Sequence, residues 1–277
     1  MNPHEYCRDR AAKSGSSFYY SFLFLSPERR QAITALYAFC REVDDVVDEC
    51  TEIEVASAKL RWWRTELDRV FDGYPAHPVG QALQDVITHF DLPREQLMEI
   101  IDGMAMDLAQ ARYADFKSLQ LYCYRVASVV GLLSAEIFSY TDRHTLKYAH
   151  DLGMAFQLTN IIRDVGDDAR RGRIYLPMDE LERFNVPATD ILESRPTAEF
   201  RRLMEFQAER AYQFYDQAMA QLPACDRRSQ RPGLIMAAIY RTLLDEIARD
   251  GFLVLDRRTS LTPVRKIWLA GMTWLRN

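Results

Sequence analysis

The sequence predicts an all-α fold in a single domain that spans residues 1–277. Proline is absent from residues 28–74 and again from residues 94–176, and both intervals are rich in residues that favour helices. Apolar residues recur there at spacings of three and four, as at Leu97, Ile101 and Met104. No alternating run of β-branched residues between turn residues indicates a strand.

The first long helix is expected to begin at Pro27 and to end near Glu49. Ser26 suits the N-cap position, and proline is favoured in the first turn because its missing N–H would be unpaired there. Further breaks are predicted where Gly, Pro, Asn and Asp gather, at residues 72–78, 91–93, 171–177, 185–187 and 230–233. These breaks separate helices of one domain.

The composition of the chain disfavours several kinds of binding partner and cellular location. A net charge of -5 disfavours nonspecific binding to nucleic acid. Five scattered cysteines without a C-x-x-C pair favour a reducing cytoplasm over a zinc or disulfide framework. The N-terminus lacks the features of a secretory signal, and no segment approaches the roughly 20 apolar residues that span a bilayer. We expect a cytoplasmic protein, with peripheral contact at the inner membrane face left open.

The first polar constellation lies on the helix that begins at Pro27. Tyr37, Arg41, Asp44 or Asp45, and Asp48 share one helical face because their spacings are four, three and four. Crowded carboxylates repel each other unless a cation lies between them, and hard oxygen ligands suit Mg²⁺. A solvated acidic face is the alternative, but the valines around the motif disfavour it.

The second constellation is a polar stripe on an otherwise apolar helix. Gln157, Asn160, Asp164 and Asp168 follow each other at spacings of three, four and four, beside Arg163. Burying carboxylates is costly unless they are paired or bind metal, so the stripe indicates a cleft wall. An amide network between two core helices is the alternative. Repetition of the same solution in two helices favours two acidic walls that hold Mg²⁺ against a diphosphate.

These motifs resemble the squalene and phytoene synthase family. The resemblance is carried by D-D-x-x-D at residues 44–48, N-x-x-R-D-x-x-x-D at residues 160–168, and the run at residues 122–127 before Gly131. It extends from about Tyr6 to Arg265. The family resemblance implies an isoprenoid synthase helical bundle around a central cavity, with Mg²⁺ as cofactor.

The resemblance also implies roles for matching residues. The implied metal ligands are Asp44, Asp45, Asp48, Asn160, Asp164 and Asp168. The implied catalytic residues are Tyr37, Arg41, Tyr122, Arg163 and Tyr240. The implied substrate contacts are Ser17, Phe18, Phe22, Arg41, Gln157, Asn160, Arg163, Tyr240 and Arg257. Guanidinium groups suit diphosphate because their planar fork meets two oxygens at once. A helix cap is the alternative role for the Ser/Gly run that contains Ser17.

Two further segments carry expectations. Arg170, Arg171 and Arg173 are interpreted as a basic lid that closes over phosphate, with local charge balance for the neighbouring aspartates as the alternative. Near the C-terminus, Val264 and Leu275 belong to an apolar stripe that includes Trp268 and Met272. We expect this stripe to dock on the core, and a membrane surface is the alternative.

The implied reaction is the head-to-head condensation of two farnesyl diphosphates to presqualene diphosphate, with release of diphosphate. The product would pass to later enzymes of squalene and hopanoid biosynthesis. Synthesis of phytoene from two geranylgeranyl diphosphates, complete squalene synthesis with a nicotinamide reductant, and class I terpene cyclisation remain alternatives. A non-catalytic helical scaffold is the alternative from a different class.

Overall fold

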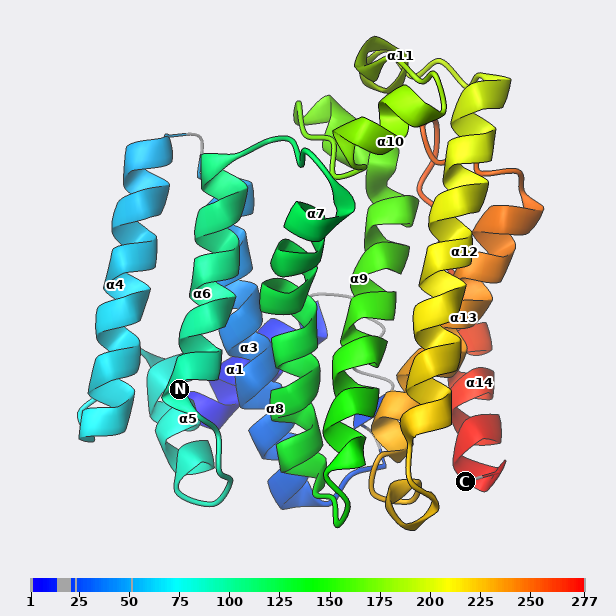
Figure 1. Cartoon of the computed structure of the whole chain (residues 1–277). Coiled ribbons are helices and arrows are strands. Elements are labelled where there is room, and N and C mark those ends of the chain that lie inside the picture. Colours follow the sequence, from blue (N-terminus) through cyan, green and yellow to red (C-terminus); the bar gives the residue numbers. More distant parts are fainter. Residues whose placement is uncertain (1, 14–20, 23, 51, 277) are drawn as a thin grey trace.

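The computed structural model describes residues 2–13, 21–22, 24–50 and 52–276, and this part of the chain is a helical bundle (Figure 1). One isolated bridge between Arg112 and Ile174 is the only β-type pairing among these residues. The helices are α1 (Pro3–Lys13), α3 (Pro27–Glu49), α4 (Ile53–Asp72), α5 (Pro78–Ile87), α6 (Arg94–Ala109), α7 (Phe116–Cys123), a π-helical segment (Tyr124–Ser128), α8 (Val129–Phe138), α9 (His144–Arg170), α10 (Met178–Arg183), α11 (Ala188–Leu192), α12 (Ala198–Gln221), a 3-10 turn (Ala224–Asp226), α13 (Arg231–Arg249) and α14 (Pro263–Arg276).

The predicted helix boundaries are confirmed at the positions that place the site. α3 begins at Pro27 after Ser26 and ends at Glu49, although the Ser26 side chain forms no capping hydrogen bond. α4 ends before Gly73, whose φ of 96° lies in the left-handed region that glycine adopts without strain. The chain therefore turns where the sequence predicts, and the first acidic motif lies on an uninterrupted helix.

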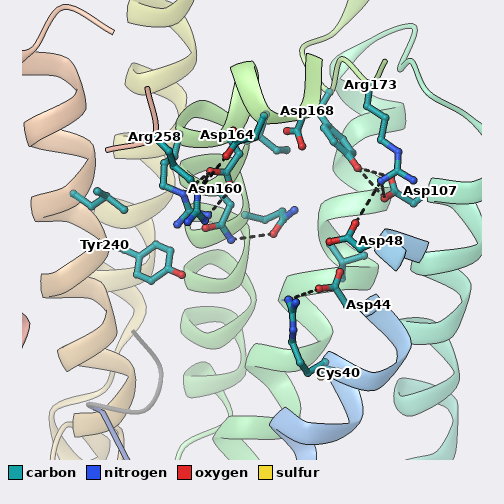
Figure 2. A pocket seen from close by; sticks show the side chains of 18 of the residues that line it. Cys40, Asp44, Asp48, Asp107, Asn160, Asp164, Asp168, Arg173, Tyr240 and Arg258 are labelled. Carbon is teal, nitrogen blue, oxygen red and sulfur yellow. Dashed lines mark hydrogen bonds and ion pairs between the residues drawn. The ribbon is translucent and has the colours of Figure 1, made fainter. Parts of the chain in front are cut away.

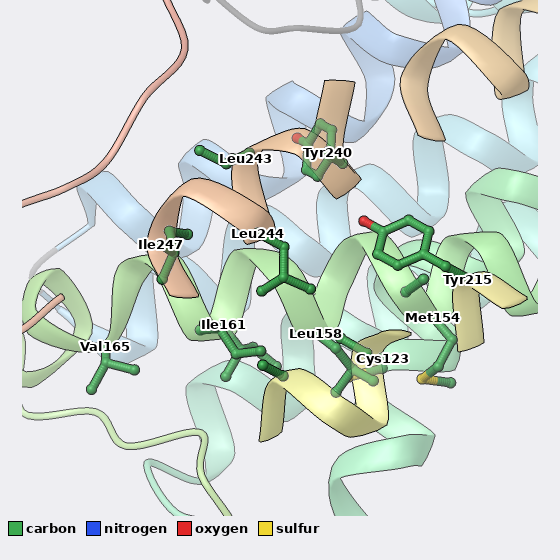
Figure 3. Close-up of a cluster of buried hydrophobic side chains, with 14 of the residues drawn as sticks. Cys123, Met154, Leu158, Ile161, Val165, Tyr215, Tyr240, Leu243, Leu244 and Ile247 are labelled. Carbon is green, nitrogen blue, oxygen red and sulfur yellow. The ribbon is translucent and has the colours of Figure 1, made fainter. Parts of the chain in front are cut away.

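Two hydrophobic clusters divide the bundle. The N-terminal cluster joins α1, α3, α4, α5, α6 and α8. In the other cluster, Leu158 and Ile161 of α9 pack with Leu244 and Ile247 of α13 (Figure 3). α3 and α9 therefore belong to different halves of the bundle. The two acidic motifs, one on each of these helices, consequently border the space where the halves meet.

Glycines allow the two halves to approach closely along α9. A Cβ on Gly153 would lie 2.6 Å from the backbone oxygen of Ala127, and one on Gly131 would lie 2.4 Å from that of Ala149. Real Cβ atoms do not come so close, so a larger residue at either position would force the helices apart. The segment from Tyr122 to Gly131, which carries part of the family resemblance, thus fixes the position of α9.

One continuous helical stretch, Phe116–Phe138, is long and apolar enough to cross a membrane, with a mean hydropathy of 1.4 over its most apolar window. This stretch contradicts the expectation that no segment is long and apolar enough to span a bilayer. The stretch packs against α6 and α9 inside the bundle, and 44% of that window is buried. A core helix passes the same measure, so this finding alone does not indicate a membrane span.

Candidate active site

A polar cavity of about 660 Å³ lies between the two halves of the bundle. Side chains from α3 and α6 face side chains from α9 and α13 across it, as Figure 2 shows for Asp44, Asp48, Asp164 and Tyr240. The charged residues that line it are Asp44, Asp48, Asp107, Asp164, Asp167, Asp168, Arg41, Arg163, Arg171, Arg173, Arg258 and Lys266. Both acidic constellations of the sequence analysis are therefore brought to one cavity.

Two adjacent aspartates of α3 lie in different surroundings. Asp44 and Asp48 line the cavity, whereas Asp45 does not. Asp45 is buried between Arg41, at 2.7 Å, and Arg10 of α1, at 2.5 Å. The structure thus corrects the expectation that Asp45 is a metal ligand, because a step of one residue turns a helical side chain away from its neighbour's direction. Asp45 instead holds Arg41, which also pairs with Asp44 at 2.7 Å.

The α9 wall carries the second motif. Asn160, Asp164 and Asp168 line the cavity on successive turns, together with Gln157. Arg163 donates from Nε to Oδ1 of Asp164 at 2.7 Å. The side-chain oxygen of Asn160 is buried and has no hydrogen-bond partner among the described residues. Burying an oxygen without a partner costs free energy, so this oxygen marks a position where a cation or a hydrogen-bond donor would fit.

Basic residues from the loop after α9 connect the two walls. Arg171 donates to Oδ1 of Asp48 at 3.0 Å. Arg173 pairs with Asp107 of α6 at 3.2 Å, as Figure 2 shows. The hydroxyl of Tyr175 donates to both oxygens of Asp107, at 2.7 and 2.8 Å. The loop therefore closes one end of the cavity, while Arg170 pairs with Asp167 at its edge.

One carboxyl group on each wall is buried close to other aspartates, and its pKa is raised. Burial, followed by repulsion from Asp48, raises the pKa of Asp44 to about 6 even though Arg41 acts in the opposite direction. Burial, followed by repulsion from Asp164 and Asp107, raises the pKa of Asp168 to about 7. Both shifts show that these carboxylates lack sufficient positive charge nearby.

Asp164 shows the opposite balance. Burial acts to raise its pKa, but hydrogen bonds and charge from Arg163 and Arg258 outweigh burial and lower it. The Nε of Arg258 donates to Oδ1 of Asp164 at 2.7 Å and lies 3.6 Å from Asp167. Asp164 therefore stays ionised, and two guanidinium groups are held beside it.

The residues that line the polar cavity suit Mg²⁺ if a bound diphosphate supplies some of its ligands. Six aspartates and six basic residues balance each other in the lining, so a bound diphosphate would add negative charge that requires cations. Within the described part of the chain, no three His, Cys, Asp or Glu side chains converge as a self-sufficient metal site. Mg²⁺ is commonly bound through one or two carboxylates with substrate phosphates and water. Asp44 and Asp48 on one wall, and Asn160, Asp164 and Asp168 on the other, would supply such ligands.

An apolar cavity of about 180 Å³ continues from the polar one. Tyr37, Gln157 and Asn160 line both. Phe22 lies in the apolar part, as expected for a substrate contact, whereas Ser17 and Phe18 lie outside the described residues. A polar site thus opens directly into a space that suits a hydrocarbon chain.

The three predicted cavity tyrosines lie where the sequence places them. Tyr37, Tyr122 and Tyr240 all line the polar cavity. Burial raises the pKa of Tyr122 well above its usual value, followed by the effect of Tyr175, whose ring stacks on it at 5.3 Å between centroids. Burial also raises the pKa of Tyr240, and Arg163 acts against that increase. The phenols of Tyr122 and Tyr240 are therefore neutral at physiological pH.

The structure corrects the assignment of Arg257. Its guanidinium lies outside the cavity and pairs with Asp250 at 2.9 Å, with 57% of the side chain exposed. Its neighbour Arg258 lines the cavity instead. The segment between α13 and α14 is irregular, so no helical period in the sequence could show which of two adjacent arginines turns inward.

Replacing Arg258 by alanine is expected to reduce kcat/KM for the prenyl diphosphate by about 10- to 10²-fold, because a charged hydrogen bond contributes about 1.5–3 kcal/mol. Arg257→Ala is the matched control and should behave as the wild-type enzyme does. Steady-state kinetics on both purified variants measure the difference. A loss confined to Arg257→Ala would show that the two arginines exchange roles in solution.

Comparisons with known proteins agree with this geometry. The family model described as squalene/phytoene synthase matches residues 11–265. The phytoene synthase of Arthrospira platensis is 36% identical over 286 residues, which cover 99% of this chain and 93% of that protein. Phytoene synthase 3 of Zea mays, a chloroplastic protein, is 37% identical over 279 residues, and the chain spans 65% of its length.

A solved structure extends the comparison to three dimensions. A dehydrosqualene synthase in complex with a ligand superposes with a TM-score of 0.90 at 29% identity, and the match covers 99% of this chain and 96% of that one. The helical arrangement around the cavity is therefore shared along nearly the whole chain. The predicted fold of a single helical bundle is confirmed.

Proposed function

The chain belongs to the squalene/phytoene synthase family, whose members join prenyl diphosphates head to head, and from this premise we propose that it converts two farnesyl diphosphates to presqualene diphosphate. The observation that carries the proposal is the meeting of two polar walls above an apolar cavity. Such a site can hold a diphosphate at one end and a prenyl chain at the other. It is a prenyltransferase site, which a non-catalytic scaffold would not require.

The first step would be cleavage of the C1–O bond of one farnesyl diphosphate. Arg163 and Arg258 are held beside the α9 wall, where they would contact the leaving diphosphate as its charge develops. Bound Mg²⁺ would supply Lewis-acid stabilisation of the same charge. Arg171 and Arg173 pair with aspartates across the cavity and would exchange these partners for phosphate oxygens when the diphosphate binds.

The allylic cation would then be protected from water. Tyr37 lies at the junction of the two cavities, and Phe156 and Val126 extend the apolar lining below it. Excluding water lets the double bond of the second substrate attack C1. Loss of one proton then closes the cyclopropane ring, so that two substrates yield one presqualene diphosphate, one diphosphate and one proton.

The narrowing of the apolar cavity far from the carboxylates favours farnesyl diphosphate over the longer geranylgeranyl diphosphate. Tyr148 lies on α9 twelve residues before Asn160, a distance of about 18 Å along the helix. Its side chain is buried, lines the cavity and reaches α13, where a Cβ on Gly233 would lie 2.6 Å from the tyrosine hydroxyl. The ring therefore narrows the end remote from the carboxylates, which favours the shorter prenyl chain.

Phytoene synthesis from two geranylgeranyl diphosphates is the second candidate, because the curated relatives described above are named as phytoene synthases. The dehydrosqualene synthase structure supports the squalene-type product instead. In the proposed pathway the product would pass to a later enzyme that reduces it toward squalene and the hopanoids.

The test is incubation of the purified protein with farnesyl diphosphate and Mg²⁺, with and without NADPH, followed by mass spectrometry. Presqualene diphosphate is expected in both reactions. Squalene formed only with NADPH would show that the enzyme continues beyond the intermediate. In a parallel reaction that offers both substrates, preferential formation of phytoene from geranylgeranyl diphosphate would establish the second candidate.

A further inference from the structure

The C-terminal helix α14 presents an apolar face to solvent. Val264, Ile267, Trp268 and Leu275 lie on one side of the helix, because the last three follow Val264 by three, four and eleven residues, spacings that return to nearly the same direction. Their exposed fractions are 78%, 56%, 61% and 81%. Val264, Trp268 and Leu275 of the predicted stripe therefore face solvent, contrary to the expectation from the sequence that the stripe docks on the core, whereas its fourth residue, Met272, is half-buried.

Contacts made by other residues of α14 explain why these apolar residues stay outward. Ala270 is buried against the core, and Trp274 stacks on Phe24 with 4.7 Å between ring centroids. Arg265 pairs with Glu246 of α13 at 2.6 Å. These contacts fix the rotation of the helix. Turning the stripe inward would break all of them, so it is available to a partner.

The charge around α14 indicates an anionic partner. Residues 257–276 contain five basic residues and no acidic residue, although the whole chain carries a net charge of -5. The basic residues are Arg257, Arg258, Arg265, Lys266 and Arg276. The first three also pair with carboxylates of the bundle, so Lys266 and Arg276 carry the local excess of positive charge. A helix with an apolar face, a tryptophan and flanking cations has the features of one that lies in a membrane interface.

We propose that α14 binds the surface of an anionic lipid bilayer, with Ile267 and Trp268 inserted at the level of the headgroups. A symmetric contact between two copies is disfavoured because it would bring the basic residues of both helices together. Lys266 and Leu261, at the start of the helix, line the polar cavity. Binding would therefore place the cavity beside the bilayer, where prenyl chains partition.

The experiment measures sedimentation of the full chain with vesicles of phosphatidylcholine, with and without phosphatidylglycerol. We expect binding to the anionic vesicles and weaker binding at high salt, because salt screens the basic residues. The double variant Ile267→Ser and Trp268→Ser should bind at least about tenfold more weakly, since it loses the inserted apolar groups.

The control is the double variant Ile53→Ser and Trp62→Ser on α4, which removes the same residue types from another exposed site. It should bind as the wild-type protein does. Absence of vesicle binding by the wild-type protein, or equal losses in both variants, would overturn the proposal. Light scattering that shows a dimer lost only in the α14 variant would assign the stripe to a second copy instead. Circular dichroism verifies that both variants fold, and because no substrate is present, the outcome is independent of the proposed reaction.

Discussion

Replacing Asp164 by asparagine is expected to lower kcat/KM by about 10²-fold or more, which is the scale on which losing one charged stabilising group at a transition state acts. The carboxylate both faces the cavity and holds Arg163 and Arg258. Asparagine keeps the size but removes the charge that a cation requires. Asp48→Asn on the opposite wall should produce a loss of similar size, because the two walls act on the same diphosphate.

A Mg²⁺ titration separates a ligand role from a structural one. If Asp48 and Asp164 bind the metal, both variants should need more Mg²⁺ for half-maximal activity. Asp216→Asn, on the exposed face of α12 where it pairs with Arg241, is the control and should titrate as the wild-type enzyme does. Circular dichroism monitors helicity. A near-normal rate in either site variant would mean that the metal site lies elsewhere.

Tyr148→Ala is expected to shift the preference from farnesyl toward geranylgeranyl diphosphate by about 10- to 10²-fold in the ratio of kcat/KM values, as a pocket does when it gains room for apolar carbons. The side chain lines the apolar cavity, about three turns of α9 before Asn160, which lines both cavities. Its hydroxyl has no hydrogen-bond partner among the described residues, so only its bulk is needed there.

Tyr148→Phe is the matched control because it keeps the ring and removes only the hydroxyl; its substrate preference should not change. A buried tyrosine-to-alanine change costs about 3–5 kcal/mol of stability, and Tyr148→Val offers a smaller cavity if the alanine variant does not fold. Competition between the two substrates, analysed by mass spectrometry, measures the preference. Unchanged preference in the folded alanine or valine variant would show that another residue sets chain length.

The sequence predicts the fold well because its signals are local. The proline-free intervals, the first turn at Pro27 and the spacing of apolar residues each act within a few turns of helix. The same period places Asp44 and Asp48 on one wall, and Asn160, Asp164 and Asp168 on the other. Helical periodicity cannot show that these two walls, which lie far apart in the sequence, face each other. That prediction comes from the resemblance to the family.

The features that the sequence analysis misses depend on contacts between distant segments. Asp107 of α6 lines the cavity and contacts Arg173 and Tyr175, which lie far from it in the sequence. Arg10 reaches Asp45 from α1. A search for carboxylates on the apolar face of α6 could have singled out Asp107, because a buried charge there requires a partner.

The ratio of diphosphate released to farnesyl diphosphate consumed tests the central claim most directly. Condensation that stops at presqualene diphosphate releases one diphosphate for every two substrates, because the product retains the second diphosphate. We predict this ratio in the presence of Mg²⁺, whether or not NADPH is added. One diphosphate released per substrate would contradict the claim, since it indicates cyclisation or hydrolysis of single substrates, or a reaction that continues to a hydrocarbon.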